Sequence, residues 1–179
     1  MVYWDATNNR PAATNPYYNA LAPHPYFVGN DINHTYAPVR AWLSRALQFW
    51  LTEYKADGFR FDMTKGFTQT QSNGGAANPN ATLNCSAYDQ SRIDNLKVYI
   101  DAVKSANPKA YTILEHFCDD AEENALAAYD STMLWRNVSY AFEQAAMGYT
   151  SGSDFSLLAS KSQSGGVGSL PTNRVAYAE

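Results

Sequence analysis

The chain has 179 residues, of which 45% are apolar and 14% aromatic, and its 17 acidic and 13 basic residues give a net charge of −4. This composition can build a sizeable core in one domain, and the many aromatic residues and the small net charge argue against a disordered chain. No apolar stretch is long enough to cross a bilayer and no basic run suits a polyanion, so we expect neither a membrane segment nor a nucleic-acid partner.

The first 37 residues have no sustained hydrophobic period. They are rich in Asn, Pro, Tyr and Ala, and X-Pro steps such as Asn15-Pro16, Ala22-Pro23 and His24-Pro25 interrupt them, so we expect a long loop. The opening residues lack the basic flank and the apolar run of a signal peptide, and we expect this start to lie inside a domain.

A strong helical pattern follows. Apolar residues recur at helical spacing from Val39 to Tyr54, which predicts a helix with Thr35 as its N-cap, Pro38 in its first turn and Gly58 as its stop. We expect this apolar stripe to be the best-buried helix face of the chain. Its members are Trp42, Leu43, Leu47, Trp50 and Leu51.

Strand and helix patterns then alternate to the end of the chain. Strands are expected at 58–62, 110–114, 132–135 and 174–178. Helices are expected around 93–103, from 119–120 to 129, at 139–147 and weakly at 155–158. Glu122 and Glu123 favour the dipole in the first turn of the second of these helices. Long loops are expected at 63–90 and around 151–168. This order predicts an α/β fold with a parallel sheet, at the spacing of a TIM barrel but with too few residues to complete one.

Two acids close neighbouring strands. Asp62 and Glu115 each end an apolar strand, and the carboxyl ends of parallel strands meet at one mouth, where paired carboxylates can cleave a glycosidic bond. Each acid could equally cap a helix or pair with a base. Arg60 lies two residues before Asp62 and on the same face of the strand, where its charge would stabilise the anion that a nucleophile needs.

These residues carry a resemblance to a known family. Residues 55–65, Lys-Ala-Asp-Gly-Phe-Arg-Phe-Asp-Met-Thr-Lys, resemble the second signature region of the α-amylase family, glycoside hydrolase family 13, which reads G-F-R-x-D-x-x-K. Residues 111–116 resemble the third region, and residues 174–179 resemble the strand that leads into the fourth. The resemblance covers the chain from about residue 20 to its end.

The resemblance implies a role for each residue. Asp62 matches the nucleophile, Glu115 the general acid/base, Arg60 the arginine that orients the nucleophile, and Lys65 a position that contacts sugar hydroxyls. The family cleaves α-linked glucans by a retaining, two-step mechanism. His116 follows the matched acid, where it either lines the cleft as a substrate contact or is a satisfied structural histidine.

The chain also departs from the family pattern. The third acid is expected after Glu179 and the first signature region before Met1. Asn33-His34 imitates the end of that first region, but Gly29 stands where its Asp belongs, so we interpret the pair as the lead-in to the helix at Pro38. Gly66 stands where many members carry a histidine, a position at which the family has a backbone calcium ligand and a sugar contact. The resemblance implies calcium only for the intact parent.

The remaining candidate ligands point to no metal. No pair of histidines has metal-ligand spacing, so we predict no zinc site. Cys85 and Cys118 could form one bridge or stay free, and we favour two free thiols.

Together these interpretations predict roughly the fourth to seventh strand–helix units of a (β/α)8 barrel with an open sheet. Residues 1–37 would be the tail of the insertion after the third strand, and residues 38–179 the partial catalytic barrel. The expected function is hydrolysis of α-1,4-linked glucans such as starch, glycogen and maltooligosaccharides, with the chain by itself nearly inactive. The alternatives are a glucan branching or transglycosylating enzyme of the same family and a non-catalytic glucan-binding relative. A secreted, periplasmic or cell-surface parent would fit these substrates.

Overall fold

Four short parallel strands form the main sheet of this chain, whose computed structural model describes residues 3–26, 29–70, 85–158 and 173–178. The strands are β3 (Gly58–Phe61), β4 (Tyr111–Leu114), β5 (Met133–Asn137) and β6 (Arg174–Tyr177). They follow one another in sheet order as in sequence order, and each pairs in parallel with the next. In the described part of the chain, β3 and β6 are the edges of an open sheet.

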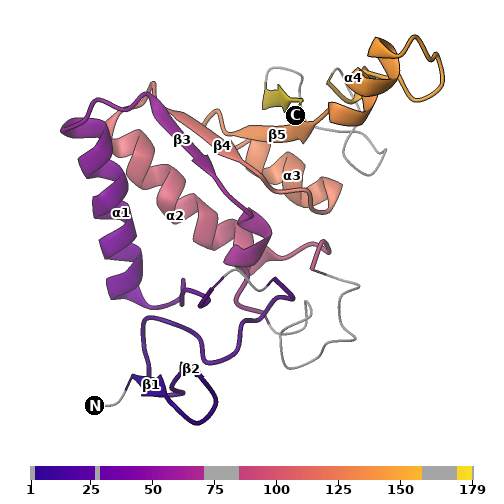
Figure 1. The fold of residues 1–179 in the computed structure, drawn as a ribbon. Coiled ribbons are helices and arrows are strands. Elements are labelled where there is room, and N and C mark those ends of the chain that lie inside the picture. The colour runs from indigo at the N-terminus through magenta and orange to yellow at the C-terminus, as the bar shows by residue number, and fades with distance from the viewer. Residues whose placement is uncertain (1–2, 27–28, 71–84, 159–172, 179) are drawn as a thin grey trace.

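One helix precedes the first of these strands, and the others lie between successive strands. They are α1 (Ala37–Thr52), α2 (Gln90–Ala106), α3 (Asp120–Ala127) and α4 (Ser139–Ala146), with short 3-10 turns η1 (Thr64–Phe67) and η3 (Ser156–Leu158). Figure 1 shows α1 and α2 side by side along β3, and α3 beneath β4 and β5. The repeated strand–helix–strand order makes this an α/β fold, as the alternating pattern predicts.

One face of the sheet packs against helices. Phe61, Leu114 and Leu134 are partners across three strands, and they contact the buried residues Ile93, Leu96 and Ile100 of α2 and Leu126 of α3. Because side chains alternate along a strand, the residues between them point to the other face. That face carries Arg60, Asp62, Glu115 and Trp135, so the sequence period separates the core from the candidate site.

The expected burial of α1 is wrong. Trp42 and Trp50 are 59% and 51% exposed, and Val39 and Leu51 are the helix's buried residues. The best-buried helix is α2, because it lies between α1 and α3 as well as against the sheet. Periodicity shows that a helix has an apolar face, but the number of neighbours that cover that face depends on tertiary packing.

Two expected boundaries of α1 are also wrong. The N-cap is Tyr36, whose side chain makes no capping bond, and the Thr35 hydroxyl instead donates to Asn33 Oδ1 at 2.6 Å. The helix ends at Thr52, before Gly58, which begins β3. A Cβ atom on Gly58 would lie 2.3 Å from the carbonyl oxygen of Tyr111, so the close approach of β4 requires glycine here.

The N-terminal segment contains a hairpin that the sequence pattern does not predict. Strands β1 (Trp4–Asp5) and β2 (Arg10–Pro11) pair antiparallel, and Asp5 Oδ1 accepts hydrogen bonds from the backbone N–H groups of Thr7 and Asn8 in the turn. Farther along, Tyr18 and Ile32 form an isolated bridge. Across the whole described chain, every helix is too short or too polar to cross a membrane.

Candidate active site

Asp62 and Glu115 lie at the same edge of the sheet. Each is the first residue after its strand, and the residues before them, Phe61 and Leu114, are partners in the β3–β4 pairing. The Glu115 N–H donates to the Phe61 carbonyl at 3.0 Å, which continues the pairing by one residue. The two acids therefore stand next to each other at the carboxyl ends of adjacent parallel strands.

One guanidinium joins the two carboxylates. Arg60 Nη1 donates to Asp62 Oδ1, and Arg60 Nη2 lies 2.8 Å from Glu115 Oε2. The side chain of Asp62 is 68% exposed, whereas that of Glu115 is 18% exposed. The structure thus brings together the three residues that the sequence singles out, with one acid open to solvent and the other sheltered.

Backbone groups also hold Glu115. The Met63 N–H donates to Glu115 Oε2 at 3.0 Å, and the Thr64 N–H and hydroxyl both donate to the Glu115 carbonyl, at 2.9 and 2.8 Å. Met63 adopts a left-handed backbone with φ of 45° at the start of the turn that follows β3. Both bonds to the carboxylate end on Oε2, and no described residue bonds Oε1, so that oxygen is the one available to a ligand.

Aromatic residues that the sequence analysis did not assign stand beside this trio. Arg60 Cζ lies 5.3 Å from the ring centroid of Trp135 on β5, and Trp135 stacks on Tyr177 of β6 with centroids 4.8 Å apart. The available signal was register, because Leu134 pairs with Leu114 and so places Trp135 level with Glu115. Sequence alone does not supply the pairing of separate strands.

His116 does not line the cleft, and its expected contact with substrate is wrong in this structure. Its ring is fully buried, with Nδ1 2.9 Å from the Thr64 hydroxyl and Nε2 2.8 Å from Glu122 Oε1. Burial lowers the pKa of His116, although the neighbouring Glu122 opposes this effect. The alternative that the sequence left open, a satisfied structural histidine, describes it.

Two buried ion pairs join the helices and strands next to the site. Glu122 accepts hydrogen bonds from Arg92 at 2.6 and 2.7 Å, and Glu123 accepts two from Arg136 at 2.5 and 3.4 Å. All four side chains are at most 1% exposed. From their place in the first turn of α3 we expect the two acids to interact with the helix dipole. In the structure they are instead buried ion-pair partners of arginines that lie 30 and 13 residues away in the sequence.

Lys65 occupies η1, just after the Asp62 turn. Its Nζ donates to the hydroxyl of Ser86 at 2.8 Å, and no bond joins it to Asp62 or Glu115 within the described ranges. The structure therefore places Lys65 near the site, at the junction with the segment that leads into α2.

The residues do not fit a metal well. His116, Cys118 and Glu122 have ligand atoms within 4.8 Å of one another, but the Arg92 guanidinium already neutralises Glu122 and burial raises the pKa of the Cys118 thiol. At Gly66, where the resemblance would place a calcium ligand, the neighbouring group is the imidazole of His24 rather than a carboxylate. Both cysteines are buried free thiols.

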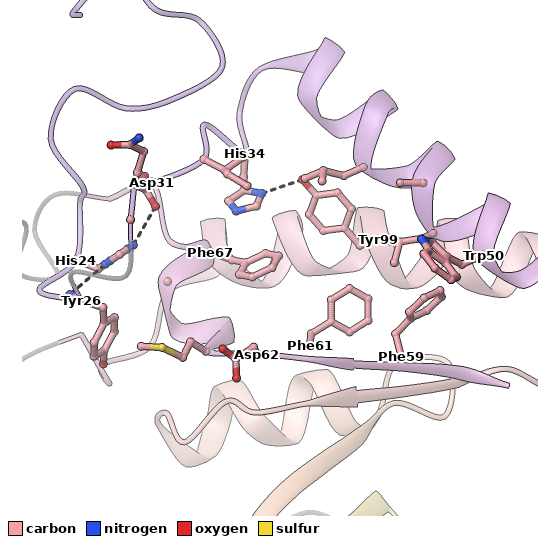
Figure 2. Close-up of a pocket in the computed structure, with 18 residues that line it drawn as sticks. His24, Tyr26, Asp31, His34, Trp50, Phe59, Phe61, Asp62, Phe67 and Tyr99 are labelled. Carbon is pink, nitrogen blue, oxygen red and sulfur yellow. Dashed lines mark hydrogen bonds and ion pairs between the residues drawn. The ribbon is translucent and has the colours of Figure 1, made fainter. Parts of the chain in front are cut away.

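A cavity of about 510 Å³ borders Asp62 on the helical side of β3. Figure 2 shows Phe59 and Phe61 pointing into it, with Trp50 of α1 at one end and the His24–Asp31 pair at the other. His34 lies in its wall and bonds the Tyr99 hydroxyl at 2.8 Å. Asp62 borders this cavity, whereas Arg60 and Glu115 are not among the described residues that line it.

Comparison with known proteins adds no family to this geometry. A scan against models of protein families finds no match to the chain, and a search of curated proteins finds no relative.

Proposed function

We propose that this chain is part of the (β/α) barrel catalytic domain of an α-amylase-type glycoside hydrolase, which acts on α-1,4-linked glucans by a retaining mechanism. The observation that carries the proposal is the bridge of Arg60 between Asp62 and Glu115 at the carboxyl ends of adjacent parallel strands. Active sites of barrels lie at this end of the sheet, and retaining enzymes use two carboxyl groups about 5–5.5 Å apart.

The two acids differ in the way that this mechanism requires. Asp62 is the more exposed and can reach a sugar ring, so it attacks the anomeric carbon. Glu115 is sheltered and donates a proton to the leaving oxygen, so that the leaving sugar departs as an alcohol and a glycosyl ester forms on Asp62. Water then gives a proton to Glu115 and breaks the ester, which restores both carboxyl groups.

Arg60 positions both groups without reacting. Its planar guanidinium donates along two edges, so one side chain fixes the spacing of the two acids. Negative charge on Asp62 is stabilised before attack, and preorganised charge of this kind contributes strongly to catalysis.

The test is release of reducing ends from soluble starch, measured for the 179-residue chain and for the longest protein that its gene encodes. We expect Glu115→Gln to lower the rate by roughly 10²–10⁴-fold, and Asp62→Asn by at least as much. Asp57→Asn is the matched control, because Asp57 is an exposed acid at the other end of the same strand.

A second measurement separates the two roles. With an aryl glycoside whose leaving group needs no proton, Glu115→Gln should recover glycosylation, whereas Asp62→Asn should stay inactive. Product analysis distinguishes hydrolysis from transfer to a second sugar. Glucan binding without turnover in the longest protein, or equal loss in Asp57→Asn and Asp62→Asn, would refute the proposed mechanism.

A further inference from the structure

The Arg60 guanidinium has a third neighbour besides the two acids. Its Cζ atom lies 5.3 Å from the centroid of the Trp135 ring, within the distance of about 6 Å at which a cation is attracted to an aromatic face. The contact spans β4, because Arg60 belongs to β3 and Trp135 to β5. It therefore needs both the long arginine side chain and the exact register of three strands.

The indole is itself held in place. Trp135 pairs with Val175 in the β5–β6 register, and the ring of Tyr177 stacks on it with an interplanar angle of 24°. Tyr177 comes from the strand on one side of β5, and Arg60 comes from the other side. Offset aromatic stacking is favourable beyond simple burial, so Tyr177 limits the rotation of the indole.

The exposed pair with Asp62 by itself would hold Arg60 weakly. The arginine side chain is 36% exposed and that of Asp62 is 68% exposed, and ion pairs in such surroundings are screened by water and oppose side-chain entropy. A guanidinium can lie against an aromatic ring and still present its N–H edges to carboxylates. Trp135 thus restricts Arg60 without competing for its hydrogen bonds.

We propose that Trp135 is a positioning residue for Arg60, which fixes the guanidinium so that it bridges Asp62 and Glu115. The proposal rests on the function proposed above. Trp135 acts through Arg60 and does not contact the substrate. Its loss should therefore lower kcat and leave KM nearly unchanged.

The test is a graded series of variants, Trp135→Tyr, Trp135→Phe and Trp135→Leu, in the longest protein that the gene encodes. We expect kcat on soluble starch to fall in that order, by about 3- to 30-fold for Trp135→Leu. Trp42→Leu is the matched control, because Trp42 is an exposed tryptophan of α1 that lies apart from the site. Circular dichroism checks that each variant is folded, and the two aromatic variants keep the test open if Trp135→Leu does not fold.

A readout independent of activity completes the experiment. The Arg60 Nε–Hε signal in NMR, assigned with Arg60→Lys, should be displaced by the indole ring current in the wild type. It should return toward the free-arginine position in Trp135→Leu and stay displaced in Trp42→Leu.

The outcomes separate the two proposals. An Arg60 signal that does not move in the Trp135 series overturns the positioning role, as does a raised KM with unchanged kcat, which would make Trp135 a sugar contact. If the Arg60 signal moves as expected but the wild-type protein cleaves no glucan, the Arg60–Trp135 contact stands and the proposed hydrolase function falls.

Discussion

Removal of Arg92 should destabilise the chain more than removal of any exposed charge. Arg92 is fully buried in α2, and all its donor groups are used. Nε and Nη2 bond the Glu122 carboxylate at 2.6 and 2.7 Å. The other bonds go to the backbone carbonyls of Lys65, Cys85 and Ala87, at 3.3, 2.8 and 2.9 Å. One side chain therefore ties α2 to α3, to η1 and to the segment at 85–87.

The magnitude follows from what Arg92→Met leaves behind. Breaking a buried ion pair by removing one partner costs about 3–5 kcal/mol, because the remaining charge is buried without compensation. Burial by itself would lower the pKa of Arg92, but the hydrogen bonds and negative charge of Glu122 raise it above its ordinary value. The charged pair is therefore the stable form. We expect the free energy of unfolding to fall by about 4 kcal/mol.

The assay is urea unfolding followed by circular dichroism, with the slope against urea compared between variants. Arg45→Met is the matched control, since Arg45 is an exposed arginine of α1, and it should change stability by about 0.5 kcal/mol or less. Arg92→Lys keeps the charge but loses the planar fork, and it should fall between the two. A loss below about 1 kcal/mol in Arg92→Met would refute the argument that this buried network holds the elements together.

Two further predictions concern stability. Burial lowers the pKa of His34 to about 4, below its ordinary value of 6.5. Between these pH values only the unfolded chain binds a proton at this histidine. The free energy of unfolding should therefore decrease as the pH falls from about 6.5 to 4, by up to ~1.4 kcal/mol per pH unit. Urea titrations at several pH values should show a shallower fall in His34→Gln, and equal slopes would contradict the assignment. Gly58→Ala should cost about 2–3 kcal/mol, because its Cβ would clash with Tyr111 on β4. Gly148→Ala is its control for backbone strain, since Gly148 also has a positive φ, of 78°, but an open Cβ position. Similar thermal shifts in the two variants would show that the clash is relieved.

Local sequence features determine the secondary structure. Strand and helix periods predict α2, α3, α4 and all four strands of the main sheet near their observed bounds, because alternation and 3.6-residue spacing are properties of neighbouring residues. The N-cap of α3 is equally local, since the Asp119 side chain accepts a hydrogen bond from the N–H of Ala121 two residues on. Arg60 and Asp62 share a face for the same reason.

Contacts between distant segments were decided only by the tertiary structure. The sequence places Glu122 in the first turn of a helix, but its burial against Arg92, 30 residues earlier, depends on how α2 and α3 pack. The exposure of Trp42 likewise depends on which neighbours cover α1. Trp135 reaches Arg60 only because three strands pair in one register. The burial of Glu122, the exposure of Trp42 and the contact of Trp135 with Arg60 all depend on segments that are distant in the sequence. Their free energies therefore depend on the whole packed structure rather than on neighbouring residues in the chain.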